Sequence, residues 1–324
     1  MNAQDPIQKN TLEIDSLQRE IHGLNTKVRL SALRDRVEDV ESTAKGFAQR
    51  VADIRGRKYA FGQTLADQGK DLAQRWRPLR TDVQNQINLE ASKLERSIQP
   101  LEASLSRLEA QRRRPSVARP LILRLKSEIR NLESKISAAD SSISGMFDQF
   151  ESEVNGFDLK VKEIENMLNE LEAASFSLTP TEAGILAVEA TFIEGKEDKN
   201  DPKGIFFLTD QRVIFERKQE IAKKKVLFVA TEKELVQEVL FEIALGHVEE
   251  ITASKRGMFK NEDHLEIRFG GGAPINSTHL HLFGQDCEMW KSTITRAKAG
   301  EFDQDRAIKV DEEVLEKMKE IPTV

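Results

Sequence analysis

The most regular pattern of apolar residues along the chain lies between Leu125 and Leu171. Apolar positions there alternate steps of four and three residues, with one additional four-residue step between Phe150 and Val154. Alternating steps average about 3.5 residues, so the stripe stays on one face only when helices supercoil with a left hand. The pattern predicts a long coiled-coil helix with a stutter at the irregular step. Its apolar positions are Leu125, Ile129, Leu132, Ile136, Ala139, Ile143, Met146, Phe150, Val154, Phe157, Val161, Ile164, Leu168 and Leu171.

Two similar runs precede this one, and prolines separate the three. The residue before a proline is pushed out of the helical region, so breaks are expected at Pro78 and between Pro115 and Pro120. Pro100 is expected to kink the second run. The pattern therefore predicts three helices folded antiparallel, although a single unbroken rod is the alternative. Exposed overhangs of such helices would favour a homo-oligomer. The expected helices span about residues 11–77, 79–113 and 120–173.

Beyond Leu178 the pattern changes to short apolar segments separated by turn-forming residues such as those at 199–204. Seven or eight short strands are typical of a sandwich or a small barrel. A final helical pattern follows at 286–299. The fold class is therefore α+β and multidomain. The expected parts are a coiled-coil domain at 1–178, a β domain at 179–302 and an amphipathic tail at 303–324 with Val310, Val314, Met318 and Ile321 on one face.

One hairpin in the second half carries a family resemblance. The stretch Gly-Ile-Phe-Phe-Leu-Thr-Asp-Gln-Arg-Val-Ile-Phe at 204–215, followed by Phe241–Ile251, resembles the motif of GRAM and bacterial PH-like domains. This resemblance implies a seven-stranded barrel that a helix bearing Trp290 closes, and a role in binding proteins or lipid surfaces. The segment at 217–239 is longer and more charged than the family's hairpin link, so an inserted helix or a long strand pair is expected there.

Composition narrows the class further. Among 324 residues there are 49 basic and 55 acidic side chains, a net charge of −6, and Cys287 is the only cysteine. A disulfide scaffold is therefore excluded, and the chain contains no apolar run near the 20 residues of a membrane span. Its first residues lack the pattern of a secretory signal, so we expect a cytoplasmic protein. No catalytic or cofactor-binding motif is recognised, so we expect a protein that is not an enzyme and has no cofactor.

The sharpest candidate site is the segment 254–260, in a predicted turn. An apolar pair flanked by cations suits an anionic bilayer or an acidic partner. The alternative is a hairpin whose Phe folds back on the barrel while the cations are solvated. The candidate residues are Lys255, Arg256, Met258, Phe259 and Lys260.

A second candidate is a basic cluster between Arg107 and Arg130, opposed in the sequence only by Glu109 and Glu128. It would form the tip of a helical hairpin that contacts a membrane surface or nucleic-acid phosphates. The alternative is a turn that cations stabilise at a helix end. The acidic total disfavours nucleic acid. The candidate residues are Arg112, Arg113, Arg114, Arg119 and Arg124.

Three weaker signals have simpler explanations. Lys223–Lys225 are expected on a solvated face, and the loop at 194–203 is too nearly neutral for phosphoinositides. His279 and His281 share a strand face and could bind zinc together with Cys287 or His264, but no metal-site spacing supports this.

These features favour a non-enzymatic scaffold or adaptor that oligomerises through its helices and binds a protein or a membrane surface through its PH-like domain. One alternative is a peripheral membrane-organising protein that uses the basic tip. Another is a coiled-coil accessory subunit of an ATPase or of a nucleic-acid-processing complex.

Overall fold

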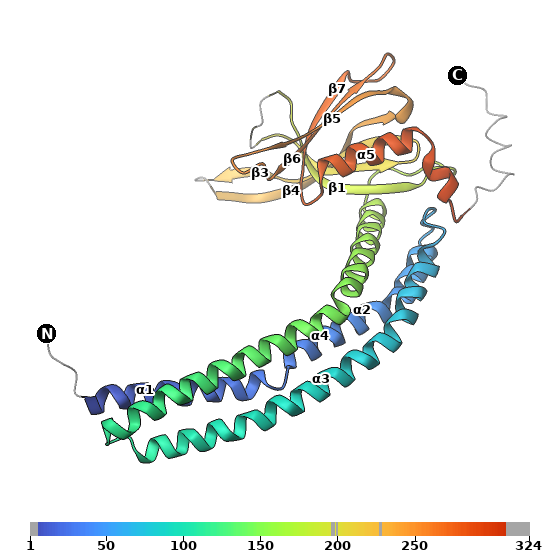
Figure 1. The fold of residues 1–324 in the computed structure, drawn as a ribbon. Helices are drawn as coiled ribbons and strands as arrows, with labels where there is room; N and C mark the ends of the chain where they lie inside the picture. Colours follow the sequence, from blue (N-terminus) through green and yellow to red (C-terminus); the bar gives the residue numbers. More distant parts are fainter. Residues whose placement is uncertain (1–5, 196–197, 199, 227–228, 309–324) are drawn as a thin grey trace. The chain divides into compact units, whose positions relative to one another are not determined.

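The computed structural model describes residues 6–195, 198, 200–226 and 229–308 (Figure 1). The chain divides into two compact units, one of residues 1–47 and 68–158, and one of 48–67 and 159–324. The first unit is helical, and the second contains the sheet. None of the helices in the described part of the chain is long and apolar enough to cross a membrane. The domain boundaries at 178 and 302 stay predictions, and tail residues 309–324 lie outside the described part.

Four long helices form the N-terminal half: α1 (Pro6–Lys27), α2 (Ser31–Gly56), α3 (Leu65–Ala110) and α4 (Pro115–Glu172). Their direction follows from the ion pairs. Within the first unit, Glu13 pairs with Lys126 and Arg36 with Glu151, so α1 and α2 run parallel to α4. Asn25 bonds Glu102 of α3, and Asp15 pairs with Arg112 in the turn that follows α3, so α3 runs antiparallel to α1. Apolar residues of all these helices are buried within one chain.

The helix boundaries correct the expected ones. The chain leaves the helix at Leu30, Lys58 and Gly62, where φ is positive, so the run expected at 11–77 is divided between α1, α2 and the start of α3. Conversely, Pro78 and Pro100 lie inside α3, and Pro120 lies inside α4, which begins at Pro115. A proline removes one helical hydrogen bond. The buried neighbours Trp76 and Val83 show that packing outweighs this cost around Pro78.

The buried apolar stripe of α4, its seam, also differs from the expected stripe at one position. Met146 is 37% exposed, whereas Phe147 is 1% exposed. The indole of Trp76 from α3 packs against the rings of Phe147 and Phe150, with ring centroids 6.3 Å and 5.3 Å away. Two consecutive four-residue steps therefore occur at Ala139, Ile143 and Phe147, earlier than the irregular step expected after Phe150.

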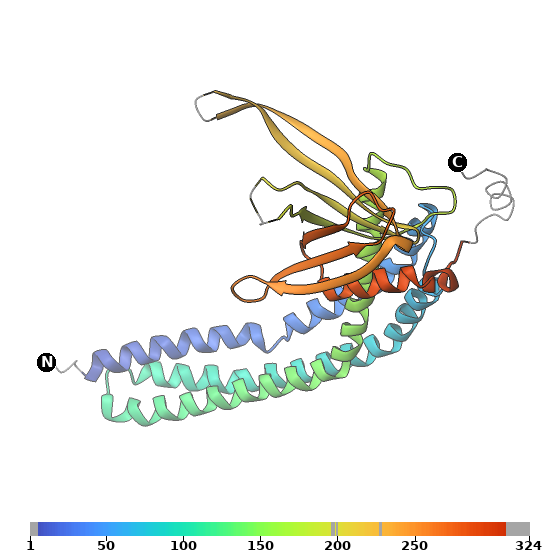
Figure 2. The ribbon, with the colours of Figure 1, turned by 90° about the horizontal axis from the view of Figure 1, so that it is seen from above.

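The second half forms one seven-stranded antiparallel sheet in the order β4-β3-β2-β1-β7-β6-β5. The ladders of the described strands leave β4 and β5 as edges. Strands β3 and β4 form a long hairpin (Figure 2), and β2 pairs with β3 only as far as Arg217. Of the two alternatives expected at 217–239, an inserted helix or a long strand pair, the structure contains the strand pair. The strands are β1 (Gly184–Phe192), β2 (Lys203–Thr209), β3 (Arg212–Val226), β4 (Val229–Ala244), β5 (Val248–Arg256), β6 (Glu262–Phe269) and β7 (Ser277–Leu282), with 3-10 turns η1 (Leu245–His247) and η2 (Glu301–Asp305).

Helix α5 (Cys287–Lys298) packs against this sheet and is capped by Asp286, whose carboxylate accepts a bond from the Met289 N–H. Trp290 is fully buried, with its ring centroid 5.0 Å from that of Phe206. Cys287 is buried as well, and its thiol is free. The predicted α+β class is confirmed: a helical region precedes a seven-stranded antiparallel sheet with a C-terminal helix.

Candidate functional site

The turn of the β5–β6 hairpin exposes two large apolar side chains. Met258 is 89% exposed and Phe259 is 82% exposed. The turn is tight, because Gly257 and Lys260 both have positive φ and the Lys260 N–H bonds the Gly257 carbonyl. The φ of Gly257 is 81°, a conformation that favours glycine because residues with a Cβ rarely adopt it. The alternative in which Phe259 folds back on the sheet does not occur.

Carboxylates neutralise two of the three cations beside this turn. The Lys255 ammonium lies 2.8 Å from Asp263 and 2.7 Å from Asp286, and these bonds, Asp263 first, raise the pKa of Lys255. Arg256 pairs with Glu266. Lys260 has no ion-pair partner among the described residues. We call Met258 and Phe259 the apolar tip; its surroundings hold three cations and the four carboxylates of Glu262, Asp263, Glu266 and Asp286.

Histidines lie beside the same hairpin. His264 Nδ1 is 3.0 Å from His279 Nε2, and the His264 ring stacks on His281 at a centroid distance of 4.6 Å. The guanidinium of Arg256 lies 3.2 Å from the same His279 nitrogen. A cation at this position opposes binding of a metal ion. No group of three metal-binding side chains is found in the described part of the chain, so the zinc hypothesis gains no support.

At the α3–α4 turn, the predicted basic cluster meets acidic residues from α1. Arg112 pairs with Asp15 at 2.9 Å, and Arg119 pairs with Glu13 at 2.6 Å. Lys126 also contacts Glu13, and this hydrogen bond is the largest cause of the lowered pKa of Glu13. The charge balance predicted from residues adjacent in the sequence therefore omitted carboxylates that α1 contributes.

The remaining residues of this cluster divide into two kinds. Arg124 pairs with Glu128 on its own helix, at 2.9 Å. Arg113 and Arg114 have no ion-pair partner within the described residues. Of the apolar stretch beside them, Ile122 is buried and Leu123 is exposed. Arg113 and Arg114 are thus the two arginines of this turn without an ion pair in the described part of the chain.

The motif that carries the family resemblance holds the linker between α4 and β1. Arg212 bonds both carboxylate oxygens of Glu182, at 2.8 Å and 3.1 Å, and the carbonyl of Ser177 at 3.0 Å. The Glu182 side chain is fully buried. Sequence reasoning did not single out Glu182, although an acid directly before the first strand was the available signal.

The neighbouring Asp210 contacts Arg306, near the end of the described part of the chain. Its carboxylate accepts a bond of 2.8 Å from the Ala183 N–H and pairs with Arg306. Burial raises the pKa of Asp210, although these two partners oppose the shift. The Thr-Asp-Gln-Arg motif therefore has a structural role in this chain: it fastens the segments that flank the sheet.

Gly204, which belongs to the same motif, is required because of a local contact between two strands. A Cβ at Gly204 would overlap the backbone oxygen of Glu216, where the β3 ladder carries an irregularity. Only glycine lets the two strands approach so closely. The weaker candidates add little. The side chains of Lys223–Lys225 and parts of the loop at 194–203 lie outside the described residues.

Comparisons with known proteins give structural likenesses only. No family model matches the sequence, and no curated protein matches it either. The N-terminal PH domain of Vps36 is 17% identical, with a TM-score of 0.26, over 38% of this chain and 83% of that one. The C-terminal domain of an unknown protein from Leishmania infantum is 18% identical, with a TM-score of 0.23, over 36% of this chain and 84% of that one.

A third likeness extends over the helices. One chain in the crystal structure of the complex between human RhoA and the DH/PH fragment of PDZRHOGEF is 11% identical to this chain, with a TM-score of 0.27. The match covers 92% of this chain and 96% of that one.

Proposed function

We propose that this protein is a non-enzymatic adaptor that binds a partner protein through the apolar tip of its β5–β6 hairpin. The observation that carries the proposal is the near-complete exposure of Met258 and Phe259 on a tight turn. Adjacent, exposed large apolar side chains mark interaction sites, because water contact at them is unfavourable. Protein interfaces are enriched in Phe and Met for the same reason.

The charges beside the apolar tip favour a protein over an anionic membrane. Four carboxylates against three cations leave the surroundings slightly negative. An anionic bilayer attracts uncancelled positive charge, and only Lys260 supplies it here. We therefore expect a partner with an apolar recess and a polar rim. A membrane surface is the second outcome that the experiment below distinguishes.

The helices supply the scaffold part of the proposal. Two arginines of α2, and Arg57 directly after it, pair with glutamates of α4 that lie 115 residues further along: Arg36 with Glu151, Arg50 with Glu165, and Arg57 with Glu172. Arginines at these positions are separated by multiples of seven residues, the repeat of a coiled coil. This spacing supports coiled-coil packing of α2 and α4. Because the apolar seams are buried within one chain, a homo-oligomer would need another surface.

A photo-crosslinking experiment tests the proposal. A photoreactive phenylalanine analogue replaces Phe259 in the full chain, expressed in its native cell. The matched control carries the analogue at Leu159, an exposed apolar residue of α4. We expect a protein adduct from position 259 and not from 159. The substitution Met258→Ser reduces the yield, because an interface anchor is lost.

Vesicle flotation supplies the opposing outcome. The full chain is mixed with neutral phosphatidylcholine vesicles or with vesicles that contain phosphatidylserine. Flotation that the Met258→Ser/Phe259→Ser chain loses, together with no protein adduct from position 259, would replace the protein partner by a membrane surface. The basic-tip and ATPase-subunit alternatives stay predictions; reversal of Arg113 and Arg114 tests the first of them in the same assay.

A further inference from the structure

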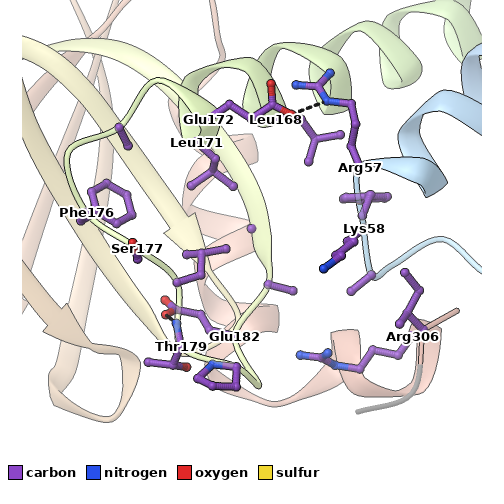
Figure 3. A pocket seen from close by; sticks show the side chains of 18 residues that line it. Arg57, Lys58, Leu168, Leu171, Glu172, Phe176, Ser177, Thr179, Glu182 and Arg306 are labelled. Atoms are coloured by element: carbon purple, nitrogen blue, oxygen red, sulfur yellow. Dashed lines mark hydrogen bonds and ion pairs between the residues drawn. The ribbon is translucent and has the colours of Figure 1, made fainter. Parts of the chain in front are cut away.

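A cavity of about 690 Å³ lies within the second unit, beside the linker that joins α4 to β1 (Figure 3). Its walls come from the α2–α3 connection at 57–60, the end of α4, the linker and the segment after η2. A volume of this size is in the range of ligand-binding pockets, about 300–1,000 Å³. The cavity lies apart from the apolar tip, none of whose residues line it.

The cavity has an apolar wall, and its charged lining residues are three cations and two carboxylates: Arg57, Lys58, Arg306, Glu172 and Glu182. Tyr59, Leu168, Leu171 and Phe176 are among the residues that line the wall. At the rim, Arg57 is paired with Glu172 at 2.8 Å, and Arg306 is paired with Asp210. These pairs fix the position of both guanidinium groups.

Lys58 is different from these two cations. It is exposed, it has a positive φ of 63°, and it has no ion-pair partner among the described residues. In Figure 3 its side chain points from the α2–α3 connection toward the linker. A positive charge held at the edge of an apolar cavity favours an occupant that combines apolar and acidic groups.

The last described residues enter the edge of this cavity. Arg306 forms an antiparallel bridge with Phe61, and the Ala307 N–H bonds the Ala60 carbonyl at 2.7 Å. Ile308 lines the cavity and is 40% exposed. The chain therefore runs along the wall that bears Lys58 and reaches the edge of the cavity at Ile308.

The remaining sequence has the composition that the cavity favours. Residues 309–324 contain three lysines and five acidic side chains, a net charge of −2. Three of the acids, Asp311–Glu313, begin three residues after Ile308 in the sequence. Apolar residues recur at helical spacing at Val310, Val314, Met318 and Ile321.

We propose that residues 309–324 occupy this cavity as an intramolecular ligand. Apolar side chains of the segment cover the wall around Leu171 and Tyr59, and the acids at 311–313 face Lys58. The covalent link through Ile308 makes the occupant's effective concentration high, so modest contacts suffice.

Peptide binding tests the proposal. A fluorescent peptide of residues 309–324 is titrated into the chain that ends at Ile308 and into the full chain, and anisotropy is measured. We expect saturable one-to-one binding to the shortened chain and at least about tenfold weaker binding to the full chain, whose cavity is already occupied. A second host, the full chain with Val310→Ser, Val314→Ser and Met318→Ser, is expected to bind the peptide like the shortened chain, and it guards against misfolding on truncation.

Charge variants of the protein and of the peptide show where the peptide binds. Lys58→Glu is expected to weaken binding about threefold to tenfold, because an attraction becomes a repulsion. Lys160→Glu, an exposed lysine of α4 outside the cavity, is the matched control and is expected to leave binding unchanged. A peptide with lysine at 311–313 is expected to bind the Lys58→Glu chain better than the original peptide does.

Three results would overturn the proposal. One is the absence of saturable binding to both hosts while their far-UV circular dichroism shows folded protein. Another is equal affinity for the full chain and the shortened chain. The third is binding that Lys58→Glu and Lys160→Glu change equally, since such binding would not occur at this cavity.

Discussion

Helix α4 and strand β2 each contain glycine inside a regular element, and the two positions have opposite physical meaning. A Cβ at Gly145 of α4 would meet nothing within 4 Å, whereas a Cβ at Gly204 of β2 would overlap the backbone of Glu216. In α4 the packing is made by seam residues, so the glycine only adds backbone freedom to the unfolded chain. In the sheet the glycine itself permits the close approach of two strands. The same residue type is therefore dispensable in one region and required in the other.

The largest expected effect tests which residues the helical seam contains. Phe147→Ala is expected to lower the free energy of unfolding by about 3–5 kcal/mol, because a fully packed aromatic ring leaves a cavity beside Trp76. Met146→Ala, one position away and partly exposed, is expected to cost less than about 1 kcal/mol. Urea unfolding followed by far-UV circular dichroism measures both. Equal losses would mean that the seam passes between the two residues.

The second largest expected loss of stability concerns Gly204 in the sheet. Gly204→Ala is expected to cost about 3 kcal/mol, because the strand pair must separate to accept the Cβ. Gly271→Ala is the control, since a Cβ there meets nothing within 4 Å and its φ is not positive. Urea unfolding followed through tryptophan emission, to which the buried Trp290 of α5 contributes, reports the change. An unaffected Gly204→Ala protein would contradict the close strand approach.

A pH titration gives the third effect and concerns the connection between the regions of helix and sheet. Burial, and then the charge of Asp305, raise the pKa of Tyr59 to about 12. The unfolded chain titrates near pH 10, so it loses its proton first. Stability is therefore full below about pH 10 and falls by roughly 2 kcal/mol as the pH rises toward 12. Tyr59 is the only tyrosine, so phenolate absorbance follows it directly. An unshifted titration would contradict its burial.

The smallest effect has the opposite sign. Gly145→Ala is expected to stabilise the protein by about 0.5–1 kcal/mol, because alanine restricts the unfolded chain and fits the open helix surface. Gly156→Ala is expected to behave in the same way. Thermal unfolding of each variant measures the gain. A loss of stability in both would show that the open side of α4 contacts another molecule.

The sequence predicted the fold where local periodicity decides it. Seam spacing in α4 and the hairpin motif around Arg212 indicated a helical region followed by an antiparallel sheet. The proline breaks were wrong because packing at Trp76 and Val83 acts from outside the local sequence. The choice of Phe147 over Met146 likewise depends on α3, since neighbouring apolar residues look equivalent until the partner helix is placed.

Prediction of the candidate sites has the same limit. Exposure of the apolar tip follows from Gly257 and its flanking turn, which are local. Charge balance does not, because Asp286 reaches Lys255 from the cap of α5, and Glu13 reaches Arg119 from α1. Counting charges along a segment therefore overestimated the free positive charge at both turns. The binding roles of these residues stay predictions.

The burial of Cys287 has a practical consequence. Its side chain is inaccessible, and burial, followed by the hydrogen bond to Asp263, raises the pKa of the thiol. Maleimide dyes require an accessible thiolate. The unmodified chain therefore reacts little with such dyes. A cysteine introduced at a surface position becomes the single site of labelling, without prior removal of Cys287.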